Sequence, residues 1–554
     1  MQRAALAVLL LGVAGCRAHS LESADREAAG IVAAGRALVP DVRGSLSLDS
    51  MESNAARTRS AYAPGEARRI SHRAALEAAT LASRDLRVER EDVMLAALAL
   101  STVRHDHEVQ PLAGAGGSLE DVDGARTVSG APTAGLRQAL ERGGNVALAL
   151  AQDFLFNVGG SPLRAAQSLL ALDLLLPMSR GAGWVARERL TQAERDVVYA
   201  LRDYAFFQQR LVLQVSTAYY RTLQAQDTWQ NEEGTYQSLL AFEARQRAHG
   251  REGAGRIPEF QVEQARQDTL RADDRRQRAR VDYEEALDEL KLLLGLPVDA
   301  SLEPDPDDLV RLRAAGPAAA PSDPAAAQGA ALERRLDLRN ARDQVDDAER
   351  RVLVARNGMG PQVDLALGAS LETGGNQPWN LREASRRLEL GLALDLPLDR
   401  IEERNAWRAS VLQGVRALRS LQGLEDRVVR EVRTAFRRLA EAERSYAIQR
   451  EGVRLAERRA ESTRLLLEAG QAQTRDVLDA QNDLVNAQNA LTRALVDHAI
   501  ARLGLDLAVG ALDVEATASL ASTPAAGTAA LPAQPPVPAP SAPAGGASTP
   551  PPTR

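Results

Sequence analysis

The feature that most constrains the fold of this chain is a very long helical stretch, residues 185–248. No proline interrupts it, and apolar side chains recur every seven residues, at Leu190, Val197, Tyr204, Leu211, Ala218 and Ala225. A seven-residue apolar repeat keeps one seam of a helix against a partner, as in coiled coils. At about 1.5 Å per residue this helix extends roughly 95 Å, more than a compact globular domain needs. The sequence therefore predicts an elongated, mainly helical protein.

The chain also repeats itself in a fixed order. Four segments of the first half have counterparts in the second half, anchored at Arg84 and Leu336, Val215 and Val432, Gly253 and Gly470, and Gly295 and Gly510. We therefore expect two structural repeats, residues 74–295 and 333–512, each with a helix, a β segment and a helical hairpin. The hairpin tips are predicted near residues 249–258 and 469–475. A Pro/Ala-rich linker, residues 296–332, joins the repeats.

Shorter helices are predicted beside the long ones, at residues 258–294, 333–357, 475–510 and 74–104. Placed end to end, the first two nearly match the length of the long helix 185–248. The C-terminal helix 475–510 is completed in the same way by 74–104. We therefore expect two short helices, stacked end to end, beside each long helix.

The β segment of the second repeat is a predicted hairpin, residues 363–396. At 363–371 and 388–396, apolar side chains alternate with small or polar ones. Strands of a membrane β-barrel show this pattern, and their backbone groups must pair with neighbouring strands because lipid offers no hydrogen-bonding partner. Alternation alone also fits a soluble, half-buried hairpin, so the surrounding helices favour the barrel.

The first repeat contains strands near residues 110–119 and 169–177, separated by an insertion, 120–168. Within it, residues 133–156 resemble an additional hairpin with a glycine turn at 142–145. Whether this hairpin joins the barrel or extends above it stays open. Without it, one chain supplies four strands, which cannot enclose a lumen, whereas three copies supply twelve.

The N-terminus has the features of a lipoprotein signal peptide, residues 1–15. Arg3 precedes a short apolar run, 4–13, too short to span a membrane. The string VAGC, ending at Cys16, resembles a bacterial lipobox, in which the cysteine is lipidated and becomes the first residue of the mature protein. Cys16 is the only cysteine, and Arg17 after it favours outer-membrane sorting by the same resemblance. An ordinary secretory signal that contains a cysteine is the alternative.

Two further segments lack a strong periodic pattern. Residues 16–73 are expected to form a mostly extended N-terminal arm or equatorial segment. The tail, residues 513–554, is rich in Pro, Ala, Ser and Thr and is expected to be disordered.

The ordered duplication, the two β segments and the string DVLDA at the second tip resemble the TolC-like outer membrane efflux family over roughly residues 74–512. The resemblance implies a homotrimer in which a 12-stranded β-barrel is continued by a long α-helical coiled-coil barrel. It implies an outer-membrane exit duct, lipid-anchored and extending into the periplasm, rather than an enzyme. Its partners are then outer-membrane lipid, a periplasmic adaptor and an inner-membrane pump, and small molecules or ions pass passively to the outside.

The resemblance also assigns roles at the tips. Asp476 and Asp479 would line the narrow periplasmic entrance and favour cations, and Glu259 occupies the equivalent place in the first tip. A capping role at a helix N-terminus explains one aspartate but not the pair. The residues expected to contact the adaptor are small or polar, namely Gly253, Ala254, Gly470, Gln471 and Ala472.

Other functions find little support in the sequence. The net charge of −7 is spread over mixed-sign stretches, so no basic footprint for nucleic acid is present. Neither a catalytic constellation nor a metal or cofactor site is predicted, and His105 and His107 are interpreted as solvated side chains. Two alternatives stay open: an exit duct of a type I protein secretion system, and a lipid-anchored periplasmic coiled-coil scaffold.

Overall fold

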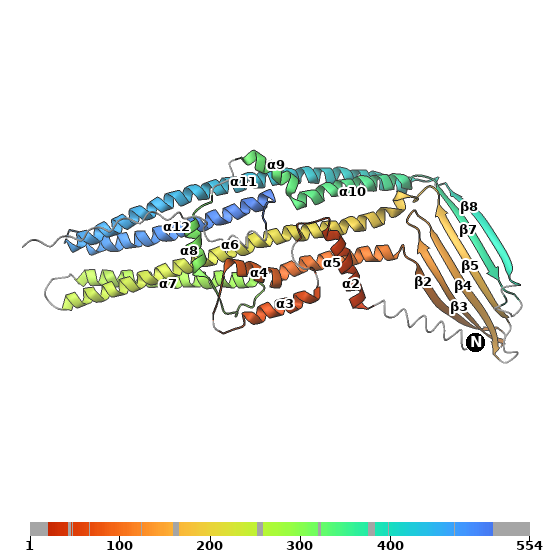
Figure 1. The fold of residues 1–554 in the computed structure, drawn as a ribbon, viewed down its shortest axis with the longest axis horizontal. Coiled ribbons are helices and arrows are strands. Elements are labelled where there is room, and N and C mark those ends of the chain that lie inside the picture. Colours follow the sequence, from red (N-terminus) through yellow and green to blue (C-terminus); the bar gives the residue numbers. More distant parts are fainter. Residues whose placement is uncertain are drawn as a thin grey trace, which may run out of the picture.

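The computed structural model describes residues 20–42, 46, 48–65, 67–122, 125–158, 165–251, 259–318, 323–374, 380, 383–396, 398–469 and 471–513. This part of the chain is an elongated bundle of helices with a curved antiparallel sheet at one end (Figure 1). The signal peptide with Cys16, the residues of the first tip at 252–258, Gly470 and the tail beyond residue 513 lie outside the described residues.

The two predicted repeats are present and share one plan. The first repeat consists of α4 (His72–Ala82), α5 (Arg84–His105), β2 (Gln110–Val122), β3 (Ala125–Ala139), β4 (Asn145–Val158), β5 (Ala165–Pro177), α6 (Trp184–Arg251) and α7 (Glu259–Leu293). The second consists of α9 (Pro324–Arg334), α10 (Leu336–Gly358), β7 (Gln362–Glu372), β8 (Ser385–Asp395), α11 (Ile401–Glu468) and α12 (Thr474–Val509). Both long helices, α6 and α11, have 68 residues, so the length predicted from the heptads is confirmed.

The predicted end-to-end pairing of the short helices is wrong. The end of α7 abuts the start of α5, and both lie along α6, whereas the end of α12 abuts the start of α10 along α11 (Figure 1). Gly295 and Gly510 end α7 and α12 with positive φ values of 73° and 71°. A Cβ on Gly295 would come 2.0 Å from the Ala82 carbonyl oxygen, so only glycine permits this close approach. Each repeat thus stacks its own two short helices.

The helix predicted at residues 74–104 is divided into α4 and α5 at Ser83. Ser83 has φ −56° and ψ 131°, which ends one helix and starts the next. Arg335, between α9 and α10, has nearly the same backbone conformation, φ −59° and ψ 127°. Both repeats therefore contain this break. The end of α7 stacks at the first break and the end of α12 stacks at the second.

The prediction of an extended N-terminal arm is also wrong. Residues in this segment form α2 (Leu21–Arg36) and α3 (Leu48–Ala61). The side chain of Ser20 accepts a hydrogen bond from the Ser23 N–H and so caps α2, and Ala28, Ile31 and Val32 on one face are buried. The linker is partly folded too, since β6 (Leu302–Pro304) pairs in parallel with β1 (Arg68–Ile70) and α8 (Pro306–Ala315) follows. These elements pack mainly against the helices of the first repeat, near the middle of the bundle (Figure 1).

The sheet has six strands in the order β2-β3-β4-β5-β7-β8, all antiparallel. The count of four strands per chain is therefore too low, because the hairpin within the insertion lies in the sheet as β3 and β4. Its turn contains Gly143 and Gly144, whose φ values of 95° and 93° suit glycine. The hairpin 363–396 of the second repeat is confirmed as β7 and β8.

Candidate functional site

The sheet separates mainly apolar from mainly polar side chains, most sharply on β7 and β8. The separation is weaker on β2, where Leu112 lies on the mainly polar face and Asp121 on the mainly apolar face. Directly paired residues of antiparallel strands lie on the same face of a sheet. One such row is Leu388, Ala369, Leu172, Leu148, Leu136 and Pro111, from β8 to β2. The four β8 leucines on this face are 59–84% exposed. A broad apolar face that the described part of the chain leaves uncovered is the surface that a membrane β-barrel presents to lipid.

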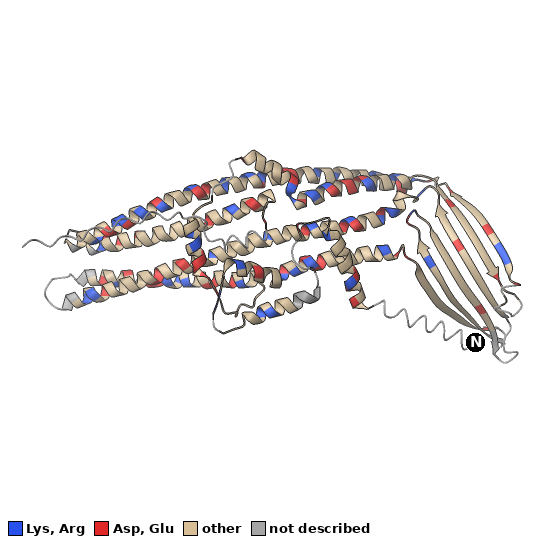
Figure 2. Ribbon diagram, in the orientation of Figure 1, with Lys and Arg blue, Asp and Glu red and all other residues tan. Residues whose placement is uncertain are grey.

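The opposite face is polar and mainly acidic. One row there is Glu389, Gly368, Asp173, Ala147, Arg137 and Gln110. The acidic residues of this face are Glu120, Asp153, Asp173, Asp364, Glu372, Glu389 and Asp395, and its basic residues are Arg137 and Arg387. Figure 2 shows that charged residues are dense along the helices and sparse on the strands. The polar face therefore suits a water-filled lumen with negative potential.

Among the described residues, no helix is both long enough and apolar enough to cross a bilayer.

The second tip places the two predicted gate residues on an exposed helix face. Asp476 and Asp479 are exposed, whereas Val477, Leu478 and Ala480 between and beyond them are buried. One Asp476 carboxylate oxygen accepts a hydrogen bond from the Gln473 N–H at 2.9 Å, so this residue caps α12. Asp479 forms an exposed ion pair with Arg475 at 3.6 Å. Capping therefore accounts for Asp476 but not for Asp479. The ion pair of Asp479 with Arg475 was not predicted from the sequence.

The other predicted tip residues are described only in part. Gly253, Ala254 and Gly470 lie outside the described residues, and Glu259 is the first residue of α7. The Gln471 N–H donates to the Leu466 carbonyl oxygen at 2.8 Å, which closes the end of α11, and Ala472 is half-buried. The small and polar character of this turn is consistent with a packing surface.

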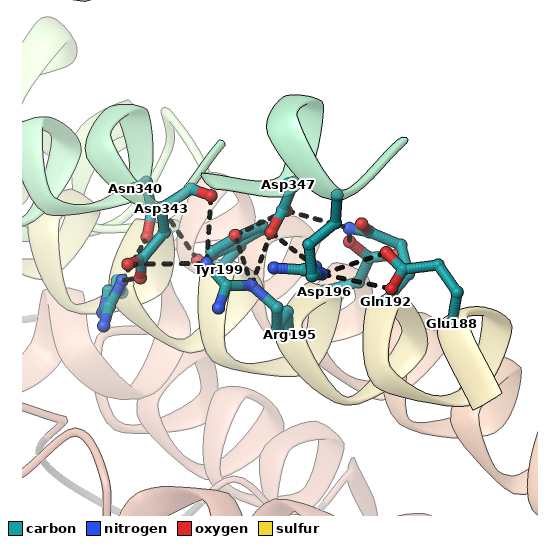
Figure 3. Close-up of polar contacts among 10 residues, drawn as sticks. Glu188, Gln192, Arg195, Asp196, Tyr199, Asn340, Asp343 and Asp347 are labelled. Carbon is teal, nitrogen blue, oxygen red and sulfur yellow. Dashed lines mark hydrogen bonds and ion pairs between the residues drawn. The ribbon is translucent and has the colours of Figure 1, made fainter. Parts of the chain in front are cut away.

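A buried polar network joins α6 to α10, and no sequence pattern predicted it (Figure 3). Asp347 on α10 is 1% exposed. Its carboxylate accepts hydrogen bonds from Tyr199 at 2.7 Å and Arg350 at 2.8 Å, and it pairs with Arg195 at 2.6 Å. Burial, followed by the hydrogen bond to Asp347, raises the pKa of the Tyr199 hydroxyl above its usual range. These partners are far apart in sequence, so only the fold brings them together.

Asp343, one turn before Asp347, continues the same contact between α10 and α6. It pairs with Arg202 at 2.5 Å and with Arg195 at 3.5 Å. Arg350 also reaches Glu188 on α6 at 3.1 Å. The network therefore fixes the second repeat against the first at the end of the bundle that carries the sheet (Figure 1).

Comparison with known proteins agrees with this architecture. Residues 328–511 match the family model described as outer membrane efflux protein. The outer-membrane channel OprN has 16% identity and a TM-score of 0.58, over 82% of this chain and 95% of that chain. The CmeC outer membrane channel of Campylobacter jejuni has 15% identity and a TM-score of 0.59, over 81% of this chain and 89% of that chain.

The MtrE outer membrane channel of Neisseria gonorrhoeae, solved in its open state, has 14% identity and a TM-score of 0.59, over 79% of this chain and 88% of that chain. At such identities the likeness to the solved channels shows a common fold. No curated protein sequence matches the chain.

Proposed function

We propose that this chain is an outer-membrane efflux channel of the outer membrane efflux protein family. It works as a homotrimer engaged by a periplasmic adaptor and an inner-membrane pump. Small molecules or ions then pass passively from the periplasm to the outside. The sheet carries the proposal. Among the described residues its apolar face is uncovered, and its edge strands β2 and β8 each pair on one side only. An unpaired strand edge is costly in lipid, so copies of the chain must close it into a barrel.

The internal duplication supplies the geometry of the contact between copies. Two of the ion pairs that join the second repeat to α6 within one chain lie at different levels of the bundle. Asp343 on α10 pairs with Arg202, and Asp497 on α12 pairs with Arg221, each at 2.5 Å. In a trimer, first and second repeats alternate around a ring. α5 and α7 of one copy then contact α11 of the neighbouring copy in the same way as α10 and α12 contact α6 within one chain.

Equivalent positions follow from the helix starts. The offset is 217 residues from Trp184 of α6 to Ile401 of α11, 252 from Arg84 of α5 to Leu336 of α10, and 215 from Glu259 of α7 to Thr474 of α12. The pair Asp343–Arg202 then corresponds to Glu91 and Arg419, and the pair Asp497–Arg221 corresponds to Asp282 and Arg438. All four corresponding residues are exposed in one chain, and both pairs keep opposite charges. We infer that they pair between copies.

Apolar side chains surround the first of these predicted contacts. Asp347 corresponds to Leu95, which is 61% exposed, and its partner Arg195 corresponds to Leu412, which is 46% exposed. The exposed residues Val88, Val415 and Leu418 lie on the same helices. An apolar contact between copies here replaces the polar network that joins the repeats within a chain.

Cross-linking tests the homotrimer directly. Leu95→Cys with Leu412→Cys, joined by a short bismaleimide in outer membranes, is expected to give a ladder that ends at the trimer. Leu95→Cys alone is the matched control and stays monomeric in denaturing gels. A ladder absent from a double variant that has reached the outer membrane contradicts the proposed contact, and a ladder ending at the dimer contradicts the trimer.

Charge reversal tests the same contact without a cross-linker. Glu91→Arg places two guanidinium groups together and is expected to lower the temperature at which the trimer dissociates. Arg419→Glu in the same chain restores opposite charges and is expected to recover most of the loss. Equal losses in the single and double variants would show that these residues do not meet.

At the periplasmic end, we propose that Asp476 and Asp479 surround the entrance, with Glu259 near them, and favour cations. Two carboxylates from each of three copies create a strongly negative constriction. Asp476→Asn with Asp479→Asn keeps the capping geometry but removes the charge. In planar bilayers the variant is expected to lose the cation selectivity of the wild type, whereas Asp483→Asn, further along α12, leaves it unchanged. Unaltered selectivity in the double variant would place the gate elsewhere.

The remaining assignments concern attachment and partners. We propose that Cys16 is lipidated and anchors the trimer, and that the tips with Gly253, Ala254, Gly470, Gln471 and Ala472 contact the adaptor. Cys16→Ser is expected to abolish incorporation of labelled palmitate, while the trimer still forms. Bulky substitution at Ala472 is expected to weaken capture of the adaptor without lowering the amount of trimer. Palmitate incorporated into Cys16→Ser would refute the anchor.

A further inference from the structure

We infer that the β3–β4 hairpin is part of the barrel wall, so that three copies close an eighteen-stranded barrel with a lumen wider than twelve strands allow. The inference rests on the proposed homotrimer. Six strands from each of three copies make eighteen. Its consequence is that solutes too wide for a twelve-stranded barrel can occupy the outer part of the duct.

The hairpin pairs with the neighbouring strands along most of its length on both sides. β3 pairs with every residue of β2, from Gln110 to Val122. β4 pairs with β5 from Asn145↔Leu175 to Leu155↔Ala165. A hairpin that rose above the wall would leave β2 and β5 to pair with each other, and here they are separated by two full strands.

Strand β4 of the hairpin continues the division between lipid-facing and lumen-facing side chains. On β4, Leu148 and Leu150 pair directly with Leu172 and Leu170 of β5 on the apolar face. On the other face Ala147 pairs with Asp173. A loop above the membrane has no need for an apolar face that stays in register with a neighbouring membrane strand.

The turn of the hairpin is fixed at the helical end of the sheet. The Gly183 N–H, at the start of α6, donates to the Arg142 carbonyl oxygen at 2.7 Å. A Cβ on Gly144 would come 2.1 Å from the Leu175 carbonyl oxygen, and a Cβ on Gly143 would come 3.0 Å from the Gly181 carbonyl oxygen. The hairpin therefore starts from the same level as the other strands and spans the same depth.

The edges of the six-stranded sheet also allow closure. Because the strands alternate in direction, β2 and β8 run antiparallel to each other. β8 of one copy can therefore pair with β2 of the next by the same antiparallel pattern that joins all other strands. Barrel diameter grows roughly linearly with strand number, so eighteen strands give a diameter about 1.5-fold that of twelve, in the range that leaves an aqueous channel.

Deletion of residues 125–158 tests the inference because it removes β3 and β4 without disturbing the topology. β2 then continues into β5 as an antiparallel hairpin, through residues 123–124 and 159–164. Each copy keeps four strands, and three copies close the ordinary twelve-stranded barrel. The outer lumen of the deletion variant is therefore expected to be narrower by about a third in diameter.

Ala171→Cys, on the polar face of β5, reports the width of the lumen in both backgrounds. Intact cells are treated with maleimide-polyethylene glycols of increasing size, and Leu172→Cys on the apolar face is the matched control. We expect the largest reagent that labels Ala171→Cys to have a diameter about 1.5-fold larger in the full chain than in the deletion variant. An equal cut-off in two trimeric proteins would overturn the inference.

A strand count by electron cryomicroscopy of the full-length trimer provides the second readout, and it does not depend on the variant folding. Eighteen strands support the inference, and a twelve-stranded wall with the hairpin outside it overturns the inference while leaving the proposed function intact. A monomer, or a protein absent from the outer membrane, would overturn the proposed function itself. The two failures are therefore distinguishable.

Discussion

The two repeats share their helices and differ in their strands. α6 and α11 have the same length, and the short helices of each repeat stack at a glycine in the left-handed region. Yet four strands of the sheet come from the first repeat and two from the second. The helical half must keep a constant length because every helix packs on its neighbours along one seam. A sheet, in contrast, accepts an added hairpin without shifting the strands on either side.

The largest effect that distinguishes the repeats is expected at Asp347. Its counterpart in the first repeat, Leu95, is exposed, whereas Asp347 is buried among Arg195, Tyr199 and Arg350. Asp347→Ala leaves the half-buried guanidinium groups of Arg195 and Arg350 without this carboxylate and the Tyr199 hydroxyl without its acceptor, so it is expected to lower the free energy of unfolding by about 3 kcal/mol. Denaturant unfolding of the solubilised full chain, followed by its helical signal, measures the loss.

Asp347→Asn provides the control for this prediction, since it keeps an acceptor for the Tyr199 hydroxyl and removes only the charge. Its loss is expected to be smaller than that of Asp347→Ala. Faster amide hydrogen exchange confined to α10 would confirm that the network holds this helix. A loss below about 1 kcal/mol for Asp347→Ala would mean that the charges contribute no more than an exposed pair does.

Substitution of Gly295 and of Gly510 compares the junction between the short helices in the two repeats. Gly510→Ala meets only ordinary neighbours, at 3.4 Å, so the expected cost is the strain of a left-handed alanine, about 1–2 kcal/mol. Gly295→Ala adds a collision with the Ala82 carbonyl oxygen and is expected to cost about 1–3 kcal/mol more. Paired unfolding measurements on the two variants give the difference. Equal losses in the free energy of unfolding would show that the backbone near Ala82 moves away from the added methyl group without a measurable loss of stability.

A pH effect is expected from the first repeat, which buries His72. This side chain is 3% exposed, its Nε2 lies 2.8 Å from the Ser216 hydroxyl, and burial lowers its pKa from 6.5 to about 4. Because the folded chain keeps His72 neutral, its contribution is complete above pH 6.5 and is lost as the pH falls towards 4. The difference between the two pKa values corresponds to about 3 kcal/mol.

Comparison with His72→Gln isolates this contribution, because glutamine keeps a polar group near Ser216 but does not titrate. The wild type is expected to lose about 3 kcal/mol more than the variant between pH 7 and pH 4. Parallel pH profiles of the two proteins would show that His72 is not the titrating group. The equivalent position in the second repeat is Pro324, so no matching effect is expected there.

The sequence predicted the helices well because the heptads and the duplication act over long, regular segments. The second-repeat hairpin was equally clear, since leucines occupy every alternate position of β8. The inserted strand β3 was harder to predict because Gly130, Thr133 and Gly135 carry little apolar alternation, and its membership of the sheet depends on pairing with β2 and β4. Strands of this composition are placed by their neighbours rather than by their own pattern.

Other features could not be predicted because they depend on which surfaces meet. The lengths of the short helices are compatible with either end-to-end pairing. Only the close approach of Gly295 to Ala82 shows that α7 stacks on α5. The network around Asp347 joins residues about 150 positions apart, and single charged residues on long helices are usually solvated. At the tips, Asp476 and Asp479 were predictable as a pair on one face, and their role at the entrance stays a prediction.

The most direct test of the account is the conductance of the purified full-length protein in planar bilayers, combined with the cross-link between residues 95 and 412. The account predicts that the trimeric, cross-linkable species gives discrete cation-selective currents, which lose their selectivity in Asp476→Asn with Asp479→Asn. A membrane-inserted sample that gives no currents and no trimeric cross-link would contradict the duct and favour a lipid-anchored scaffold.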